Sequence, residues 1–317
     1  MNLTNKSNIM KQEIVDIADL DVIFLSYDEP KKEEFWIKVQ NMIPWAKRVD
    51  GIKGSDAAHK AAAQASDTDR FILIDGDNIP DPEFFNLQLT LTEQNKDCVF
   101  RWKARNHVNG LMYGNGGLSC WTKNFVNTMR THENTDGTDE TAVEFCFDPK
   151  YIAMHDCYST TYPNGSSFQA WRAGFREGVK MCLNRGTKPS LTDFEKQVHA
   201  RNYDHLCIWQ SVGMDVENGF WAIYGARLGT YFTMLRDWDY KQVQDFDHLE
   251  YLWSSFSRDT ENNCTALGET LRTRLSMPIV DMTAEQSKFF KHHYKHGYKN
   301  IGTTITEMDV IRRQEGW

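Results

Sequence analysis

Two carboxylates separated by one glycine follow a run of four apolar residues in the segment "FILIDGDNIP" (71–80). Asp75 and Asp77 can point the same way on an extended chain, and Gly76 lets the backbone turn closely. Neighbouring carboxylates repel unless a cation neutralises them, and Mg²⁺ or Mn²⁺ prefers such oxygen ligands. Because these ions keep positions open for phosphate oxygens, the pair predicts a metal site with a diphosphate as co-ligand. The alternative is an acidic turn that ends a buried strand.

The elements before this pair alternate in type. Apolar runs typical of strands alternate with helical spacings, and we expect strands at 21–30, 45–52 and 70–75 and helices at 31–42 and 55–66. This rhythm predicts a parallel α/β sheet with helices on both faces. Ligands of such sheets bind outside the carboxyl ends of the strands, which is where Asp75 and Asp77 lie.

The hydrophobic pattern of the chain changes after Pro163, from mostly strand-like to helical. Before it we expect a strand at 97–104, a glycine-rich loop at 106–121, and a strand or short helix at both 140–148 and 151–156. After it, helical patterns are expected at 167–183 and around 193–212, 217–236 and 282–294. The sequence therefore predicts an α/β core at 21–165 with a mostly helical C-terminal subdomain at 166–317, preceded by a poorly ordered lead-in at 1–20.

Composition excludes several classes of protein. The chain has 317 residues and a net charge of −8, which argues weakly against a polyanionic partner, although basic residues gather in 101–130 and 166–190. We expect neither a signal peptide nor a membrane span, because no apolar run is long enough. Seven cysteines without a CxxC pair argue against a zinc site or a disulfide framework and predict a cytoplasmic protein.

Three stretches of the chain resemble one enzyme family. The segments "GSDAAHKAAAQASDTDRFILIDGDN" (54–78), "VFRWKARNHVNGLMYGNGGLSCW" (99–121) and "FQAWRAGFREGVKM" (168–181) resemble phage glycosyltransferases related to the base J glucosyltransferase. The resemblance covers about residues 21–185. It implies the GT-A fold, a Rossmann-like mixed sheet that binds a nucleotide diphosphate sugar, and transfer of a sugar from a UDP-sugar to the hydroxymethyl group of 5-hydroxymethylcytosine in double-stranded DNA. The helical subdomain would then lie on the acceptor side.

The resemblance also implies roles for individual residues. Asp75, Gly76 and Asp77 would bind the diphosphate, with Mn²⁺ or Mg²⁺ held by the two acids. The residues that would line the nucleotide pocket are Ser26, Tyr27, Asp28 and Glu29, with His59 and Lys60 near the diphosphate. The loop from Tyr113 to Gly117, including Asn115 and Gly116, would form the floor of the sugar site. Three glycines within five residues independently favour close approach of the backbone to a ligand.

Two further parts of an active site remain open in the sequence. Inverting transfer to a hydroxyl needs a general base, and Asp139 and Glu140 are the candidates, within an acidic segment that is equally consistent with a solvated loop. The resemblance implies a third metal ligand from a later segment. For that role we expect His155, beside Asp156 as a further catalytic candidate, although a histidine at a strand end is the plainer interpretation.

Basic and aromatic residues are the candidates for contact with DNA. Arg172, Arg176 and Lys180 recur every four residues and predict a basic stripe that meets phosphates of DNA or of the donor, or else a solvated helix face. The segment 101–105 adds Arg101, Lys103 and Arg105. Trp102, Trp121 and Trp171 could stack on an exposed base, although most tryptophans belong to cores.

The acceptor is not fixed by these patterns. The alternatives are a GT-A glycosyltransferase with a protein, lipid or saccharide acceptor, which the overall acidity favours, and a non-catalytic protein that binds a sugar nucleotide or nucleic acid.

Overall fold

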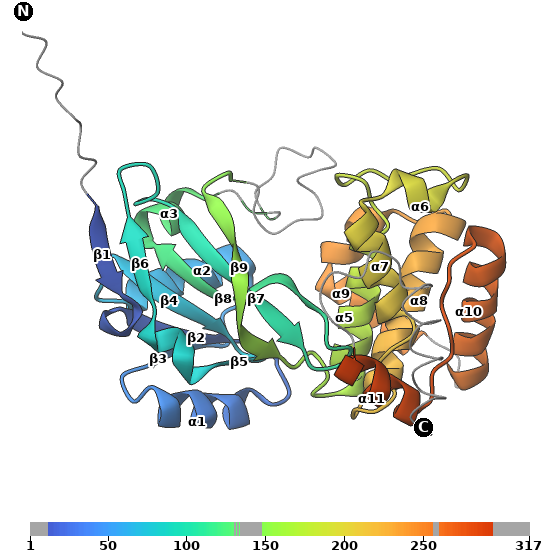
Figure 1. The fold of residues 1–317 in the computed structure, drawn as a ribbon, viewed down its shortest axis with the longest axis horizontal. Helices are drawn as coiled ribbons and strands as arrows, with labels where there is room; N and C mark the ends of the chain where they lie inside the picture. Colours follow the sequence, from blue (N-terminus) through green and yellow to red (C-terminus); the bar gives the residue numbers. More distant parts are fainter. Residues whose placement is uncertain (1–11, 130, 132, 134–147, 256–259, 294–317) are drawn as a thin grey trace, which may run out of the picture.

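A computed structural model of the chain describes residues 12–129, 131, 133, 148–255 and 260–293. Figure 1 shows two parts, a sheet with its covering helices and a bundle of helices beside it. The last strand of the sheet, β9, ends at Thr161 and the first helix of the bundle, α5, begins at Ser167. This change from sheet to helices lies where the sequence predicts it. The chain is therefore a mixed α/β protein with a mostly helical C-terminal half.

Seven strands form the main sheet, in the order β3-β2-β4-β8-β7-β9-β5. Their bounds are β2 (Asp21–Ser26), β3 (Lys47–Asp50), β4 (Arg70–Asp75), β5 (Asn78–Pro80), β7 (Val99–Asn106), β8 (Met112–Thr122) and β9 (Tyr151–Thr161). The predicted parallel arrangement is confirmed for β3, β2 and β4. Strand β8 runs antiparallel to both β4 and β7, and β5 antiparallel to β9, so the whole sheet is mixed.

Helices cover both faces of the sheet. Phe35 and Val39 of α1 (Lys32–Met42) belong to the same buried cluster as Ile72 of β4, whereas Ala62 of α2 (Ser55–Ala65) shares a cluster with the preceding strand residue, Phe71. Successive side chains of a strand point to opposite faces, so α1 lies on one face and α2 on the other. Helix α3 (Lys123–Thr128) joins α2. The predicted helices at 31–42 and 55–66 are confirmed.

The predicted lead-in is wrong in its second half. Residues 13–19 form a strand, β1 (Glu13–Asp16), and a short helix, η1 (Ile17–Asp19). Strand β1 pairs with β6 (Gln88–Leu91), and Ile17 is buried against the segment that includes η2 (Pro82–Asn86). A strand of four residues whose partner is far along the chain carries too little periodicity to be recognised.

The glycine-rich segment is a strand and not a loop. Residues from Met112 to Thr122 form β8, in the middle of the sheet. The pairing of β7 with β8 shifts between Arg101 opposite Ser119 and Lys103 opposite Gly114, so β8 carries three extra residues there. Glycine tolerates such irregular pairing, which is why a loop-like composition is found inside a strand.

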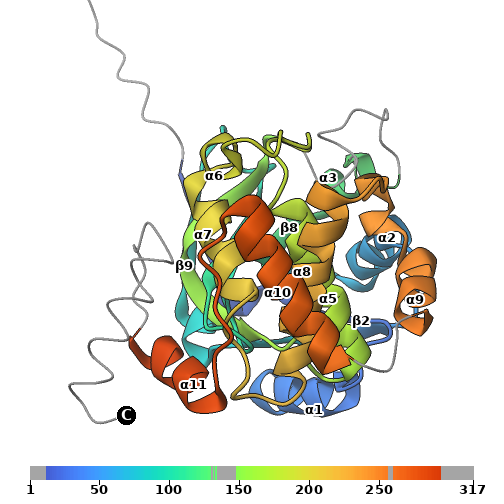
Figure 2. The same ribbon diagram turned by 90° about the vertical axis from the view of Figure 1, so that its right-hand side faces the viewer.

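The C-terminal half is a bundle of helices (Figure 2). Its elements are α5 (Ser167–Lys180), α6 (Phe194–Gln197), α7 (Ala200–Trp209), α8 (Gly219–Leu235), η4 (Tyr240–Gln244), α9 (Phe246–Ser254), α10 (Thr260–Leu275) and α11 (Ala284–His293). The predicted helical regions are confirmed, and α9 and α10 are additional. Within the described residues, no helix is both long enough and apolar enough to cross a bilayer.

Glycines bring α5 and α8 into direct backbone contact. A Cβ atom on Gly174 would overlap the carbonyl oxygen of Ala222, and one on Gly225 would overlap that of Trp171. Gly178 and Gly229 repeat this pattern one turn further along each helix. The four glycines are spaced by four residues on each helix, so they form one facing stripe. Their lack of side chains sets the distance between the two central helices.

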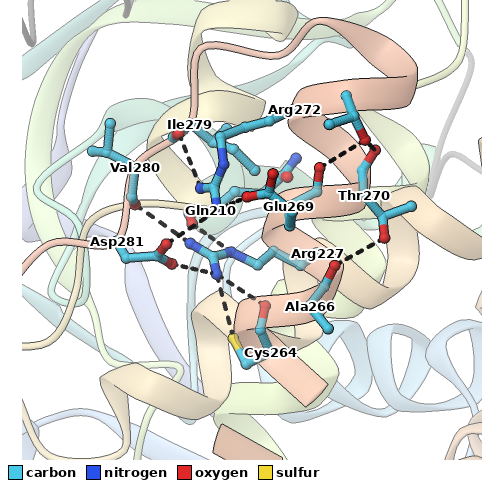
Figure 3. A network of polar contacts seen from close by, with 11 residues as sticks. Gln210, Arg227, Cys264, Ala266, Glu269, Thr270, Arg272, Ile279, Val280 and Asp281 are labelled. Carbon is cyan, nitrogen blue, oxygen red and sulfur yellow. Dashed lines mark hydrogen bonds and ion pairs between the residues drawn. The ribbon is translucent and has the colours of Figure 1, made fainter. Parts of the chain in front are cut away.

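A buried arginine ties the bundle together (Figure 3). The Arg227 guanidinium, which is 2% exposed, donates to the carbonyl oxygens of Gln210 (3.0 Å) and Cys264 (3.0 Å). It forms an ion pair with Asp281 at 2.7 Å. Since a buried charge is stable only when it is paired and hydrogen-bonded, this network is structural.

Candidate functional site

The carboxyl ends of the three parallel strands meet at one edge of the sheet. Ser26 at the end of β2 lies opposite Asp50 at the end of β3, and Leu25 lies opposite Asp75 at the end of β4. The predicted meeting of strand ends at this edge is therefore present. Polar side chains end each strand, and they fall into a hydrogen-bonded group around Asp50 and an acidic group around Asp75.

Three acidic side chains form the second group, which we call the carboxylate site: Glu29, Asp75 and Asp77. A Cβ atom on Gly76 would lie 2.6 Å from the Oε2 atom of Glu29 and 2.9 Å from the Cβ atom of Ser26. Only glycine allows this approach of β4 to the loop after β2. Gly76 therefore brings the Glu29 carboxylate to the pair at the end of β4.

Burial and neighbouring charges raise the pKa values of these carboxyl groups. Burial, followed by the charges of Asp77 and Glu29, raises the pKa of Asp75 well above its ordinary value. Burial and the Glu29 charge raise the pKa of Asp77 to about 6, with a hydrogen bond from Thr161 and the charge of Arg172 acting in the opposite direction. The pKa of Glu29 is raised by burial as well. The site thus carries more negative charge than its surroundings neutralise.

The cation that opposes this charge comes from the helical half. Arg172 of α5, whose side chain is 15% exposed, forms an ion pair with Asp28 at 3.1 Å. Its guanidinium carbon lies 5.2 Å from the ring centre of Phe168 and 4.9 Å from that of Phe246. The two rings fix the position of the guanidinium. Arg172 therefore connects the bundle to the loop after β2, beside the carboxylate site.

A network of charged and polar groups surrounds Ser26. Its hydroxyl donates to Asp50 at 2.7 Å and accepts from Arg48 Nε at 3.2 Å. Lys32 donates to Asp50 (2.7 Å) and to the Tyr27 carbonyl oxygen (2.6 Å). The Tyr27 side chain itself is exposed. Of the residues predicted to line a nucleotide pocket, Ser26 is held inside the network and Tyr27 faces solvent.

A metal ion is consistent with two of the predicted ligands but not with the third. The carboxylates of Asp75 and Asp77 are the oxygen ligands that Mn²⁺ and Mg²⁺ take, and their raised pKa values indicate unneutralised charge. His155, however, is exposed in the middle of β9, six residues before Thr161, whose hydroxyl bonds Asp77. Six residues of strand span about 20 Å. The described residues contain no group of three or more His, Cys, Asp or Glu side chains placed to hold a metal ion. A metal ion bound by Asp75 and Asp77 would therefore take its remaining ligands from the diphosphate and water.

The predicted residues of α2 are engaged within the helix. The Nδ1 atom of His59 donates to the Ser55 carbonyl oxygen at 2.7 Å, and its ring lies edge-on to Trp121 with centres 5.0 Å apart. Burial lowers the pKa of His59, so the ring is neutral at pH 7. Lys60 forms an ion pair with Asp56 at 2.6 Å. The structure thus gives both residues contacts within α2 or against the sheet.

The glycine segment of β8 lies beside the carboxylate site. Ile74 pairs with Leu118, and the residues that follow this pair at the strand end are Asp75 on β4 and Gly117 on β8. The extra residues of β8, which include Asn115 and Gly116, fall within this irregular stretch. The structure therefore brings the predicted floor of the sugar site to the predicted diphosphate pair, although from a strand.

Several other candidates lie elsewhere. Asp156 is exposed on β9 beside His155, and Asp139 and Glu140 fall outside the described residues. The expectation that tryptophans stack on an exposed base is wrong for the three that were named, because Trp102, Trp121 and Trp171 are buried in the core. Each packs against other apolar side chains.

The six candidate DNA-binding residues separate into two groups. On α5, Arg172 pairs with Asp28, Arg176 with Gln244 and Lys180 with Glu177. That helix face is therefore occupied by contacts within the protein. On β7, Arg101 packs over the Tyr151 ring at 4.9 Å, Lys103 is half-buried, and Arg105 is exposed.

Sequence reasoning missed one residue of this edge, Asp50, and the position of another, Arg172. Asp50 ends β3 as Asp75 ends β4, so the rule that ligands bind at the carboxyl ends of strands could have selected it. The placement of Arg172 beside Asp28, 144 residues away in the sequence, carries no local signal.

No protein-family model matches the chain, and no curated protein matches it.

Proposed function

We propose that this protein is a metal-dependent glycosyltransferase of the GT-A type, which moves a sugar from a UDP-sugar to the hydroxymethyl group of 5-hydroxymethylcytosine in DNA. One observation carries the donor half of the proposal. Three carboxylates with raised pKa values meet at the carboxyl ends of parallel strands, where no cation within the described residues forms an ion pair with Asp75 or Asp77. Such an edge is complementary to a divalent cation and a diphosphate.

Each group at this edge would have a role in binding the donor. A Mn²⁺ or Mg²⁺ ion held by Asp75 and Asp77 would supply stabilisation of the charge on the leaving diphosphate. Arg172, held between two aromatic rings, would donate to a diphosphate oxygen in place of Asp28. The exposed Tyr27 ring would lie against the uracil, and the Asp50 carboxylate, oriented by the Ser26 hydroxyl, would accept a hydrogen bond from the ribose.

The acceptor half of the proposal rests on the family resemblance and on the basic residues of β7. General-base assistance to the acceptor hydroxyl stays assigned to Asp139 or Glu140 as a prediction. The alternatives are a protein, lipid or saccharide acceptor with the same donor chemistry, and a binding protein without catalysis.

The test is a transfer assay with a matched pair of variants. The protein is incubated with Mn²⁺, a panel of UDP-sugars and DNA that contains either cytosine or 5-hydroxymethylcytosine, and nucleosides are analysed by mass. We expect a sugar to be added only to the hydroxymethylated base. Asp75→Asn should abolish transfer, whereas Asp97→Asn, which changes an exposed aspartate on a distant turn, should not. Transfer that survives in Asp75→Asn would refute the proposed role of the carboxylate site.

A further inference from the structure

A hollow adjoins the carboxylate site on the edge of the sheet formed by β5 and β9. Its volume is about 360 Å³, within the range of small-molecule pockets. The strand pairing places Ile79 opposite Thr160, Thr160 opposite Arg105, and Arg105 opposite Met112. Paired residues on neighbouring strands share a face, so these four side chains form one row across four strands. All four line the hollow.

The hollow is connected to Asp77 by short contacts. The backbone N–H of Tyr162, which lines the hollow, donates to the Asp77 carbonyl oxygen at 2.8 Å. Ile79 follows Asp77 by two residues. The hydroxyl of Thr161, between the lining residues Thr160 and Tyr162, bonds the Asp77 carboxylate. A molecule in the hollow would therefore lie next to a sugar donor bound at the carboxylate site.

The lining offers two flat rings and a cation. Tyr158 and Tyr162 line the hollow, and contacts fix both rings: Tyr158 against Phe84 at 5.9 Å and Tyr162 against Phe35 at 5.2 Å between centres. Flat rings at the wall of a hollow are surfaces on which a base can stack.

Arg105 gives the hollow its charge. Its side chain is exposed, and within the described ranges it has neither an ion pair nor a side-chain hydrogen bond. Lys103 lies two residues earlier on the same strand, so it points to the same face and extends the positive charge away from the hollow. A cation at the rim of an aromatic pocket is suited to the phosphate of a nucleotide whose base enters the pocket.

We propose that this hollow binds an unpaired pyrimidine base of DNA, with its phosphate on Arg105 and its ring against Tyr158 and Tyr162. The assignment rests on the proposed function, for which it supplies the acceptor site. Enzymes that modify a base must take it out of the stack, and a pocket beside the donor would hold the flipped base. The base would enter between the rings of Tyr158 and Tyr162 and the row of lining side chains formed by Ile79, Thr160, Arg105 and Met112.

Base entry is tested by fluorescence with the full-length protein. A short single-stranded oligonucleotide carries the fluorescent cytosine analogue pyrrolocytosine, whose emission falls when the base stacks on a ring. We expect quenching on binding to the wild type. Thr160→Trp should fill the hollow and weaken quenched binding by about tenfold or more, as expected when base stacking is lost. The control Ala153→Trp adds the same ring at an exposed site further along β9.

Phosphate contact is tested with a second pair of variants that removes a charge at the rim without filling the hollow. Arg105→Gln should weaken oligonucleotide binding several-fold and reduce the salt dependence by about one released counterion. Arg274→Gln makes the same change of charge at an exposed position on α10 and should leave both unchanged. If Thr160→Trp binds like Ala153→Trp and Arg105→Gln binds like Arg274→Gln, the hollow is not the base site.

Binding of UDP with Mn²⁺, measured on the same samples, separates this inference from the proposed function. If UDP binds but quenching does not depend on Thr160, the base pocket is refuted while the donor site stands. If quenching depends on Thr160 but UDP does not bind, the base pocket stands and the proposed transfer fails.

Discussion

Two charged places in this protein are built in opposite ways. In the helical half, the buried guanidinium of Arg227 is bonded by backbone carbonyls and paired with Asp281. At the edge of the sheet, Glu29, Asp75 and Asp77 gather three carboxyl groups, and burial together with the charge of Glu29 raises the pKa values of both aspartates. The first arrangement is complete within the chain. In the second, no described cation forms an ion pair with Asp75 or Asp77, so this edge is the place to look for a ligand.

The comparison also separates two uses of glycine. Gly174 and Gly225 bring two helix backbones together, which fixes the bundle. Gly76 brings the Glu29 carboxylate to the end of β4, which concentrates charge. In both places a side chain would clash. Only the contact at Gly76 brings carboxyl groups together, and this raises the free energy of the folded protein when no metal is bound. Mutations in the two regions should accordingly have different consequences.

The largest change in stability is expected in the bundle. Arg227→Ala leaves Asp281 without its partner and several carbonyl oxygens without a donor, so it should lower the free energy of unfolding by about 3–5 kcal/mol. Denaturation in urea measures this loss. Arg274→Ala, on the exposed face of α10, should change it by less than about 0.5 kcal/mol. Equal small effects of the two variants would contradict a structural role for the Arg227 network.

The reverse pattern, lost activity with little lost stability, is expected for Arg172. If it donates to the diphosphate, Arg172→Gln should lower the kcat of sugar transfer by about 100-fold, the usual effect of removing one donor to a developing charge. Arg176→Gln is the matched control, because Arg176 packs over the same Phe246 ring from the next turn. An equal loss of kcat in both variants would show that packing against Phe246, and not the charge, is what matters.

Gly174→Ala tests the stripe between α5 and α8. Replacing glycine by alanine inside a helix normally stabilises it by up to about 1 kcal/mol. Here the added methyl group would overlap the Ala222 carbonyl oxygen, so we expect a loss of about 1–3 kcal/mol instead. Thermal unfolding followed by circular dichroism decides the sign. A gain in stability would mean that the helices separate at no cost.

An effect of similar size on stability is expected to depend on pH. Because the pKa of Asp77 is raised to about 6, the folded metal-free protein holds this proton more tightly than the unfolded chain. That stability is present below pH 4 and is lost as the pH rises through about 6. Asp77→Asn should therefore stabilise the metal-free protein at pH 7.5 by about 1–3 kcal/mol. At pH 4, Asp77→Asn should have little effect on stability. The control, Asp97→Asn, should have little effect at both pH values. The same stabilisation at both pH values would contradict the charge argument.

Local sequence patterns predicted the helices and strands more accurately than they predicted the contacts between them. The apolar runs around Phe71 and Val22 predicted β4 and β2, and the strand-end rule then placed Asp75 at the ligand edge. Composition misled at β8, where glycines suggested a loop, because the irregular pairing that they permit depends on β7. The position of Arg172 beside Asp28 follows from the packing of α5, which the sequence of α5 alone does not reveal.

The most direct test of the carboxylate site is the metal dependence of UDP binding, measured by titration calorimetry on the wild type and on Asp75→Asn. We expect the wild type to bind UDP at least about tenfold more tightly with Mn²⁺ than without it, a coupling of about 1.4 kcal/mol. We expect Asp75→Asn to bind UDP equally weakly in both conditions. If Mn²⁺ strengthens UDP binding to Asp75→Asn as much as to the wild type, the acids at the end of β4 do not hold the cation.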